Sequence, residues 1–259
     1  MLGKLNSWLI FRGINFRSGL RNLKALKWYN KDYSKFKEQL SAGNDFPLGK
    51  KWPILHDKFS EGGTMTGHYF HQDLLVAKRL FVAKPVKHVD VGSRVDGFVA
   101  HVAVFREIEI FDIRPAVSKV KNIKFIQADF MKLRQELIGY TDSISSLHAI
   151  EHFGLGRYND PIDVDGHLKG LESIYHCLKK GGKFYFSVPI GPQRVEFNAQ
   201  RVFSIEYLLK LFKDKYSINS FSFVDDKGDL HESVELKESD IQNNFGCECG
   251  CGIFEMTKI

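Results

Sequence analysis

Cysteine is scarce in this sequence, and long apolar runs are absent from it. The chain has 259 residues but only four cysteines, Cys177, Cys247, Cys249 and Cys251. Small secreted domains depend on dense disulfide frameworks, and four cysteines at this spacing do not supply one. We therefore expect a reducing compartment and a cytoplasmic protein. No apolar run is long enough for a membrane-spanning helix.

The N-terminal segment lacks the features of a signal peptide. Its apolar run, Trp8–Phe11, is too short for the core of such a peptide, and no small-residue cleavage site follows it. Lys4 and Arg12 flank the run, so it also fits a basic amphipathic helix on a membrane surface. We favour a helix packed on the domain, with peripheral membrane contact through the N-terminus as the alternative.

Two common nucleotide-binding motifs are missing. No Gly-Lys-Ser/Thr tract follows a glycine turn, which excludes a P-loop. Gly92 and Gly97 occupy the first and third positions of a G-x-G-x-x-G motif, but Arg94 occupies the second. The second glycine lets the backbone approach a pyrophosphate, so a side chain there argues against a dinucleotide dehydrogenase.

The composition indicates a globular and mildly basic protein. Hydrophobic residues make up 43% of the chain, and phenylalanine alone contributes 22 residues, which supports a well-packed core. The formal net charge is +6. This excess permits an anionic partner such as nucleic acid, a phosphorylated sugar or a membrane surface, but the lysines are spread along the chain, which favours a basic solvated surface.

Strands and helices alternate over most of the chain. We predict short strands over residues 88–91, 107–111, 123–128, 143–147, 183–188, 217–224 and 252–256. The alternation from residue 86 to about 212 predicts an α/β fold, with a mostly parallel sheet and helices on both faces. Ligands bind such sheets at the carboxyl ends of the strands.

Two further segments complete the organisation. Residues 1–60 are basic and aromatic, and we interpret them as an N-terminal extension of two or three short helices, followed by the main domain over residues 61–259. A strong helix is predicted from Gly67. Its buried face is predicted from apolar residues at helical spacing, namely Phe70, Leu74, Ala77, Leu80 and Phe81.

Polar residues follow four of the predicted strands. Asp90, Asp112, Asp129 and His148 each stand at or just after a strand end. Asp112 lies 20 residues after Gly92, the spacing at which nucleotide-binding sheets place an acid on ribose hydroxyls. The series predicts a single pocket at this edge of the sheet.

No metal site is predicted. Cys247, Cys249 and Cys251 alternate along a strand and lack a second ligand pair at zinc-site spacing, so we interpret them as small residues on a strand face. The acids of loop 160–165 offer oxygen ligands for a hard cation, but a loop with a helix cap at Asp165 explains them more simply.

Several tracts together resemble the class I S-adenosylmethionine-dependent methyltransferases. They are Val89-Asp90-Val91-Gly92, Asp112, Ala128-Asp129, Leu147–His152 and Leu178–Phe184. Residues from about 61 to the end more narrowly resemble an uncharacterised methyltransferase-like family of unknown function, whose bacterial members are often associated with surface-polysaccharide genes. The narrower match rests on Gly67–Asp73, Glu151–Tyr158, Asp160–Asp163, Phe197–Arg201 and Gly250–Phe254.

The resemblance implies a Rossmann-like, seven-stranded sheet whose last strand is antiparallel, and S-adenosyl-L-methionine as cofactor. It places the methionine part of the cofactor at the glycine turn, the ribose at Asp112, and the adenine at Asp129 and Phe130. The family's turn is usually richer in glycine, whereas Ser93 and Arg94 stand inside it here. The full set of candidate cofactor-binding residues is Asp90, Gly92, Ser93, Arg94, Gly97, Asp112, Asp129, Phe130 and His148.

Methyl transfer to a hydroxyl also needs a base, and histidine titrates near neutral pH. We predict His152 as the base, with His148 as the second choice and Glu151 as the group that orients it. The fourth strand does not end in the Asn/Asp-Pro-Pro-aromatic tract of amino methyltransferases, which favours an oxygen acceptor. Candidate substrate-binding residues are Tyr69, His71, Arg157 and Arg201.

The sequence therefore predicts an S-adenosylmethionine-dependent methyltransferase that acts on an oxygen of a sugar-like or phosphorylated small molecule, with a role in polysaccharide biosynthesis. Two alternatives stay open. One is a non-catalytic binding module that keeps the sheet, and the other is an RNA methyltransferase, which only the charge suggests. DNA is not an expected partner. The oligomeric state is not predicted.

Overall fold

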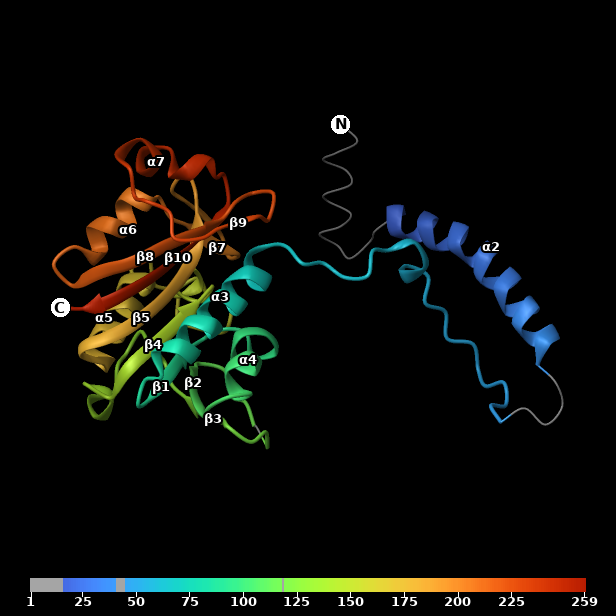
Figure 1. The fold of residues 1–259 in the computed structure, drawn as a ribbon, viewed down its shortest axis with the longest axis horizontal. Helices are drawn as coiled ribbons and strands as arrows, with labels where there is room; N and C mark the ends of the chain where they lie inside the picture. Colours follow the sequence, from blue (N-terminus) through green and yellow to red (C-terminus); the bar gives the residue numbers. More distant parts are fainter. Residues whose placement is uncertain (1–15, 41–44, 118) are drawn as a thin grey trace. The chain divides into compact units, whose positions relative to one another are not determined.

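The structure is a computed structural model of the chain, and it describes residues 16–40, 45–117 and 119–259. The predicted amphipathic segment at Trp8–Phe11 lies outside these residues. The chain divides into two units, Met1–Thr64 and Met65–Ile259. Both are drawn in Figure 1.

In the described part of the N-terminal unit, one long helix covers a stretch for which the sequence predicted short helices. Helix α2 spans Phe16–Gln39. A short 3-10 turn, η1 (Asp57–Phe59), packs on it: the ring of Phe59 meets that of Trp28 edge-on at 6.2 Å, and Lys58 Nζ lies 4.5 Å from the centre of the Trp28 ring. Among the described side chains of this unit only Ala25 is buried, so these residues form no hydrophobic core of their own.

The second unit is built on one sheet of eight strands in the order β3-β2-β1-β4-β5-β10-β8-β9. Parallel pairing joins β3 to β2, β2 to β1, β1 to β4 and β4 to β5, whereas β10 is antiparallel to both β5 and β8. The strands are β1 (His88–Val91), β2 (Ile108–Asp112), β3 (Ile123–Gln127), β4 (Thr141–Leu147), β5 (Leu178–Ile190), β8 (Tyr216–Val224), β9 (Leu230–His231) and β10 (Gly250–Lys258).

Helices cover both faces of this sheet (Figure 1). One hydrophobic core joins α5 (Gly166–Cys177) and α6 (Ile205–Phe212) to the sheet, and it includes Ile174, Leu208 and Phe212. The other core joins α3 (His68–Ala83) and the turn η2 (Val95–Val99) with α4 (Ala100–Ala103), and it includes Leu80, Phe98 and Val102. The predicted α/β fold class is confirmed.

The remaining elements are short. A separate hairpin pairs β6 (Arg194–Glu196) with β7 (Gln200–Val202). Helix α7 covers Glu238–Gln242, and three further 3-10 turns are η3 (Gln135–Leu137), η4 (Ile150–His152) and η5 (Asn244–Gly246). The sequence analysis did not predict these elements, because they have too few residues to show a period.

Two details differ from the predictions. The sheet has an eighth strand, β9, which adds two residues at the edge beside β8. The predicted buried face of α3 is only partly correct. Ala77 and Leu80 are buried, but Phe70, Leu74 and Phe81 are exposed, and the polar side chains of Gln72 and Asp73 are buried instead. The helix therefore turns polar groups toward the sheet at its N-terminal end.

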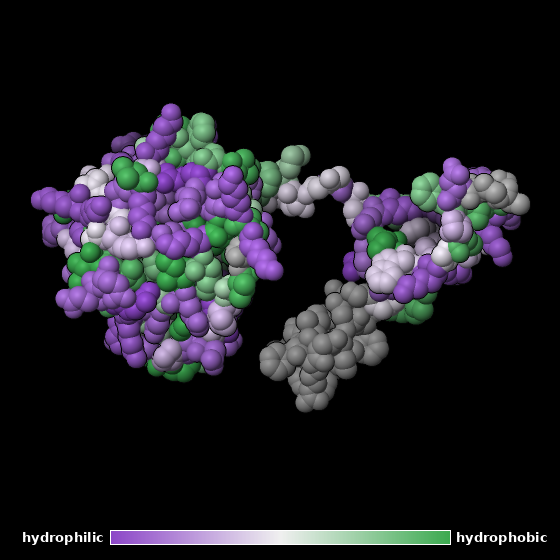
Figure 2. Space-filling view, turned by 90° about the horizontal axis from the view of Figure 1, so that it is seen from below, coloured by the Kyte–Doolittle hydropathy of each residue, from purple (hydrophilic) through white to green (hydrophobic). Residues whose placement is uncertain are grey.

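The surface of the larger unit is mixed. Figure 2 shows one face on which hydrophilic residues predominate, with small apolar patches between them. Within the described ranges, none of the helices combines the length and the apolar character needed to cross a membrane.

Candidate functional site

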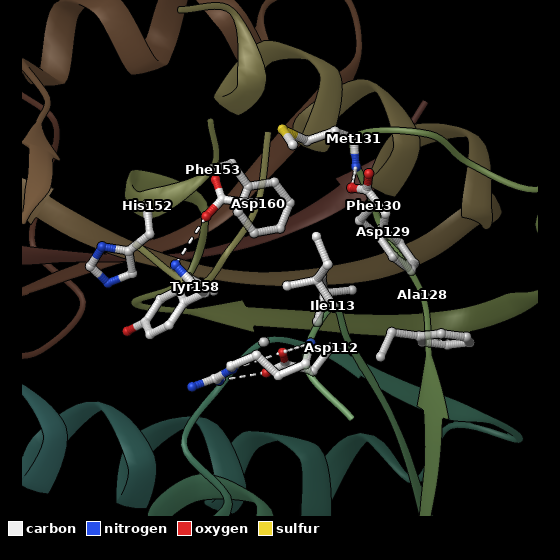
Figure 3. A pocket seen from close by; sticks show the side chains of 15 residues that line it. Asp112, Ile113, Ala128, Asp129, Phe130, Met131, His152, Phe153, Tyr158 and Asp160 are labelled. Carbon is white, nitrogen blue, oxygen red and sulfur yellow. Dashed lines mark hydrogen bonds and ion pairs between the residues drawn. The ribbon is translucent and has the colours of Figure 1, made fainter. Parts of the chain in front are cut away.

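A pocket opens at the carboxyl ends of the parallel strands, where the sequence predicted it. It is lined by residues at or just after the carboxyl ends of β1, β2, β3 and β4. Open α/β sheets bind ligands at this edge. Figure 3 shows the lining residues, which are Val91, Gly92, Phe111, Asp112, Ile113, Arg114, Ala128, Asp129, Phe130, Met131, Ala149, His152, Phe153, Tyr158 and Asp160.

The glycine turn after β1 forms the floor of the pocket. Gly92 has a φ of +73°, a conformation that side chains rarely allow, and a Cβ atom placed there would lie 3.0 Å from that of Ala149. Asp90 does not reach the pocket. It is fully buried beneath the turn, where it accepts hydrogen bonds from the backbone N–H and hydroxyl of Ser93 and from the hydroxyl of Ser145. Asp90 thus holds the turn together and is not placed to touch a ligand.

The other residues of the turn also lie outside the pocket lining. Ser93 is buried, and its hydroxyl accepts a hydrogen bond from the backbone N–H of Leu147. The guanidinium of Arg94 is half-exposed and pairs with Asp96. Gly97 packs against α3, where a Cβ atom would lie 2.2 Å from a carboxylate oxygen of Asp73. The second predicted glycine therefore serves packing.

Asp112 ends β2 on the rim of the pocket. Both of its carboxylate oxygens accept hydrogen bonds from the guanidinium of Arg114, at 3.0 and 2.6 Å. The guanidinium carbon lies 4.3 Å from the centre of the Tyr158 ring, which projects from the loop after η4 (Figure 3). The carboxylate predicted to bind ribose hydroxyls is therefore in the pocket, and Arg114 engages it.

Asp129 and Phe130 follow β3 and line the same pocket, as predicted. One oxygen of Asp129 accepts a hydrogen bond from the backbone N–H of Met131 at 2.8 Å. Phe130 is buried, and its ring lies 5.2 Å from that of Phe111. These contacts fix the two residues at the end of the pocket farthest from His152 in Figure 3.

The two candidate catalytic histidines after β4 lie in different surroundings. His152 lines the pocket, and its Nδ1–H donates to the backbone carbonyl of Ala199 at 2.7 Å. Burial lowers the pKa of His152 below its usual value of 6.5. His148 does not line the pocket. Burial also lowers the pKa of His148, but Cys251 and Glu151 more than offset this and raise it well above 6.5.

Glu151 contacts both histidines. It is fully buried, and one of its carboxylate oxygens accepts a hydrogen bond from Nδ1–H of His148 at 2.8 Å and lies 3.7 Å from Nε2 of His152. This carboxylate holds the His148 ring by a hydrogen bond and lies near the His152 ring without one, and its role in orienting the base stays a prediction.

The candidate substrate-binding residues are dispersed. The Tyr69 ring lies 5.1 Å from the His148 ring, and the guanidinium carbon of Arg94 lies 4.7 Å from the centre of the Tyr69 ring. Burial raises the pKa of the Tyr69 hydroxyl. The His71 ring packs edge-on against Phe70. Neither residue lines the pocket.

The two predicted arginines hold backbone groups. Arg157 donates to the carbonyl of Ala199 at 2.8 Å, which places it next to His152. Arg201 is buried, and its guanidinium donates to four backbone carbonyls in segments 151–153 and 163–164. Arg201 therefore holds the loop after β4 and does not line the pocket.

The acidic loop supplies residues that the site prediction missed. Asp160 lines the pocket, and its carboxylate accepts hydrogen bonds from the backbone N–H groups of Gly154, Gly156 and Tyr158. Asp163 pairs with Lys169. These contacts hold Asp160 and Asp163 within their own loop. Asp165 stands at the N-cap of α5, but its side chain makes none of the predicted capping hydrogen bonds. The tract Glu151–Tyr158 was singled out in the sequence, but nothing in it indicated that Tyr158 turns inward.

Comparison with known proteins places this geometry in a family. A profile described as "Caenorhabditis protein of unknown function, DUF268" matches residues 89–247, which is more than half of the chain and includes the whole pocket lining. The chain belongs to this family. No curated protein matches the sequence.

Solved structures show the fold. The chain is similar to 1,6-didemethyltoxoflavin-N1-methyltransferase of Burkholderia thailandensis, solved with 1,6-didemethyltoxoflavin and S-adenosylhomocysteine bound, with a TM-score of 0.52 at 15% identity over 72% of this chain and 78% of that one. The N-methyltransferase NodS of Bradyrhizobium japonicum WM9, in complex with S-adenosylhomocysteine, has a TM-score of 0.48 at 11% identity, over 74% of this chain and 88% of that one. An S-adenosylmethionine-dependent methyltransferase of Clostridium acetobutylicum has a TM-score of 0.47 at 13% identity, over 73% of this chain and 91% of that one. The fold of this DUF268 protein is a methyltransferase fold.

Proposed function

We propose that this DUF268 protein binds S-adenosylmethionine in the pocket and transfers a methyl group to an oxygen of a small polar molecule. One observation carries the proposal: the glycine turn after β1 and the acids at the ends of β2 and β3 converge on one pocket. The methyltransferase whose structure it resembles at a TM-score of 0.52 was solved with S-adenosylhomocysteine bound, which supports the same ligand class here.

The lining residues fit such a ligand. Gly92 lines the pocket with backbone alone, so a bound group can approach that backbone closely. Asp112 offers a carboxylate for ribose hydroxyls, and Asp129 with Phe130 offers a carboxylate and an aromatic ring for adenine. When bound, S-adenosylmethionine supplies a methyl group on a positively charged sulfur. The residues of the chain hold the two reactants together, which alone contributes on the order of 7–11 kcal/mol in favourable cases.

His152 is the base in this proposal. Its Nδ1–H is fixed on the carbonyl of Ala199, so Nε2 carries the free electron pair. Because burial lowers the pKa of His152, the ring is uncharged at neutral pH and can accept a proton from an acceptor hydroxyl. Arg157, held beside it, is the nearest cationic group for a phosphate or carboxylate on the acceptor.

The acceptor class in this proposal is a sugar-like or phosphorylated small molecule. The residues after β4 are His148-Ala149-Ile150-Glu151 in place of a tract that grips a planar nitrogen, and this supports an oxygen acceptor. A role in polysaccharide biosynthesis, a cytoplasmic location and peripheral membrane contact through the N-terminal segment stay predictions.

Titration calorimetry with S-adenosylmethionine and S-adenosylhomocysteine tests the proposal. We expect saturable binding of both at one site per chain. Failure of both to bind at millimolar concentration would leave the non-catalytic module as the better interpretation. If both bind, a screen of hydroxylated and phosphorylated acceptors, with release of S-adenosylhomocysteine as the signal, tests the acceptor class, and methylation of RNA in place of small molecules would contradict it.

A further inference from the structure

We propose that His68, His148 and Cys251 bind a zinc ion. These residues come from three distant segments: His68 begins α3, His148 follows β4, and Cys251 lies in β10. One ligand atom from each lies within 4.8 Å of the others. We call these three residues the His-His-Cys cluster. Their convergence behind Glu151, outside the pocket lining, is not required by the proposed methyl transfer.

The two ring nitrogens of His148 indicate an unfilled position. Nδ1–H donates to Glu151, whereas Nε2 is buried and makes no hydrogen bond of ordinary geometry, although the side chain of Cys251 is close enough to raise the pKa of His148. A buried polar nitrogen without a partner is unfavourable unless something else binds it. In zinc sites, the ligating histidine usually donates its other ring N–H to a carboxylate, which is the arrangement of His148 and Glu151.

The backbone holds His148 in this orientation. Its φ is +50°, which is uncommon for a residue with a side chain, and its N–H donates to the carbonyl of Ser187 on β5 at 3.0 Å. The His68 ring stacks on the His148 ring at 5.2 Å with planes 14° apart. Residues held in uncommon conformations often serve a site, and here the conformation directs the ring toward His68 and Cys251.

Cys251 supplies the soft ligand. It is fully buried and free of any disulfide, and its S–H lies 3.6 Å from the side-chain oxygen of Gln72. A thiolate with two imidazoles is a donor set that suits zinc rather than magnesium or calcium. Binding displaces the thiol proton of Cys251 and any proton on the two ligating nitrogens into solvent, so the charges balance.

The cluster needs only a small adjustment to hold the ion. Zinc bonds of about 2.0–2.1 Å to nitrogen and about 2.3 Å to sulfur place two tetrahedral ligands roughly 3.3–3.7 Å apart. His68 is only partly buried, so its ring can close the remaining distance. It also lines a surface hollow with Asp225, Asp226, Glu248 and Lys227, in which the three acids outnumber the one lysine and favour cations.

Three protein ligands leave a fourth position for water or another group, as in catalytic zinc sites. Glu151 links the cluster to the pocket, because the oxygen that binds His148 lies 3.7 Å from Nε2 of His152. The charge of the ion would therefore act on the candidate base through a single carboxylate. Ion binding itself does not depend on the proposed methyl transfer and is measured without any methyl donor.

The test uses the full chain, stripped of metal and titrated with Co²⁺ and then Zn²⁺. We expect one equivalent of Co²⁺ to give the visible bands of a tetrahedral site and a near-ultraviolet band from a thiolate ligand, and one equivalent of Zn²⁺ to abolish both. Cys251→Ser should remove the thiolate band, and His68→Ala should weaken Zn²⁺ binding at least tenfold, the scale on which even loss of outer-shell partners acts.

Two matched variants control for position and residue type. Cys249→Ser lies two residues from Cys251, and His71→Ala lies one turn from His68, and both should keep the wild-type spectrum. If Cys251→Ser fails to fold, as judged by circular dichroism, the Zn²⁺ affinity of His68→Ala tests the proposal, because His68 is partly exposed. A wild-type protein that gives no thiolate band, or a band that depends on Cys249 and not on Cys251, overturns the proposal.

Discussion

The pocket and the His-His-Cys cluster both contact Glu151, yet they are built in different ways. The pocket is open, and its acids come from consecutive strand ends, so each lies a short distance along the chain from the next. The cluster is largely buried, and its members come from residues 68, 148 and 251. Successive parallel strands bring the pocket together, whereas the antiparallel strand β10 and helix α3 complete the cluster.

This difference separates residues that can contact a ligand directly from residues that only hold other side chains in place. A group on the rim of the pocket, such as Asp112, exchanges solvent for a ligand and can be tested by binding. A fully buried group such as Asp90 or Glu151 acts through its neighbours. Substitutions on the two sides of Glu151 should therefore give different readouts, and the predictions below use that contrast.

The largest effect is expected at His152. His152→Asn keeps a donor for the carbonyl of Ala199 but removes the base, so turnover should fall by roughly 10²- to 10⁴-fold. Affinity for S-adenosylhomocysteine should stay within a few-fold of wild type. His176→Asn, an exposed histidine paired with Glu172 far from the pocket, is the matched control. Full turnover in His152→Asn would move the base to another residue.

The pH profile sharpens the same assignment. An imidazolium cannot accept a proton, so the rate should fall in acid through the pKa of His152. Because burial lowers that pKa below 6.5, the fall should lie below pH 6.5, with a plateau at neutral pH. Arg157 opposes protonation of His152 and Glu151 favours it, so Glu151→Gln should shift the fall further toward acid. Rates measured from pH 5 to 8 on both proteins provide the test.

Asp90 should affect the free energy of unfolding of the chain, because it is buried and does not contact a ligand directly. Burial raises its pKa to about 6 from 3.8, although its serine hydrogen bonds oppose the shift. The folded chain therefore binds this proton more tightly than the unfolded chain. Its contribution to the free energy of unfolding is complete below pH 4 and is lost as the pH rises through 6, a difference of about 3 kcal/mol.

Asp90→Asn removes the titrating group, so denaturant unfolding between pH 4 and 7 should show a flatter slope than wild type. Asp73, whose pKa burial also raises to about 6, keeps part of the slope. Asp45→Asn, in the N-terminal unit, is the control and should leave the slope unchanged. An unchanged slope in Asp90→Asn would mean that Asp90 is ionised throughout this range.

Asp112, in contrast to Asp90, should affect ligand binding. Hydrogen bonds to a charged group contribute about 1.5–3 kcal/mol, so Asp112→Asn should weaken S-adenosylhomocysteine binding by roughly 10- to 100-fold. Zinc binding to the His-His-Cys cluster should not change. Asp96→Asn is a close control, because Asp96 pairs with Arg94 at the same spacing but lies outside the pocket lining. Equal losses in the two variants would argue against a ribose contact.

The part of the pocket that lies at strand ends could be predicted from the sequence. Asp112, Asp129 and Phe130 reach the pocket because position at the end of a buried parallel strand determines where a residue lies. Asp90 and Ser93 were predicted to bind the cofactor. The sequence cannot show that β4 lies beside β1 and brings the hydroxyl of Ser145 onto the Asp90 carboxylate. Arg201 was predicted to bind substrate because its contacts with backbone carbonyls of segments 151–153 and 163–164 leave no regular pattern in the sequence.

The cluster could not be predicted, since it depends on the antiparallel register that places Cys251 opposite Pro189. Its cysteine was interpreted from local spacing, which lacked a second ligand pair, and the two histidines lie 80 residues apart, as their numbers show. The only available signal was the polar start of α3. Gln72 and Asp73 proved to be buried, so that end of the helix was chemically unusual for a reason that only the fold reveals.

The smallest effect is expected at Arg114, and it bears on the pocket alone. Its guanidinium occupies both oxygens of Asp112, the same atoms that ribose hydroxyls would use. Because Arg114 is half-exposed, the pair contributes at most about 1 kcal/mol, so Arg114→Ala should tighten S-adenosylhomocysteine binding by up to about fivefold. Arg94→Ala removes the equivalent pair outside the pocket lining and should leave affinity unchanged. In Asp112→Asn the gain should vanish, since the competition needs the carboxylate. Weaker binding in Arg114→Ala would instead show that the guanidinium contacts the ligand, and Asp112 would then position an arginine in place of binding ribose itself.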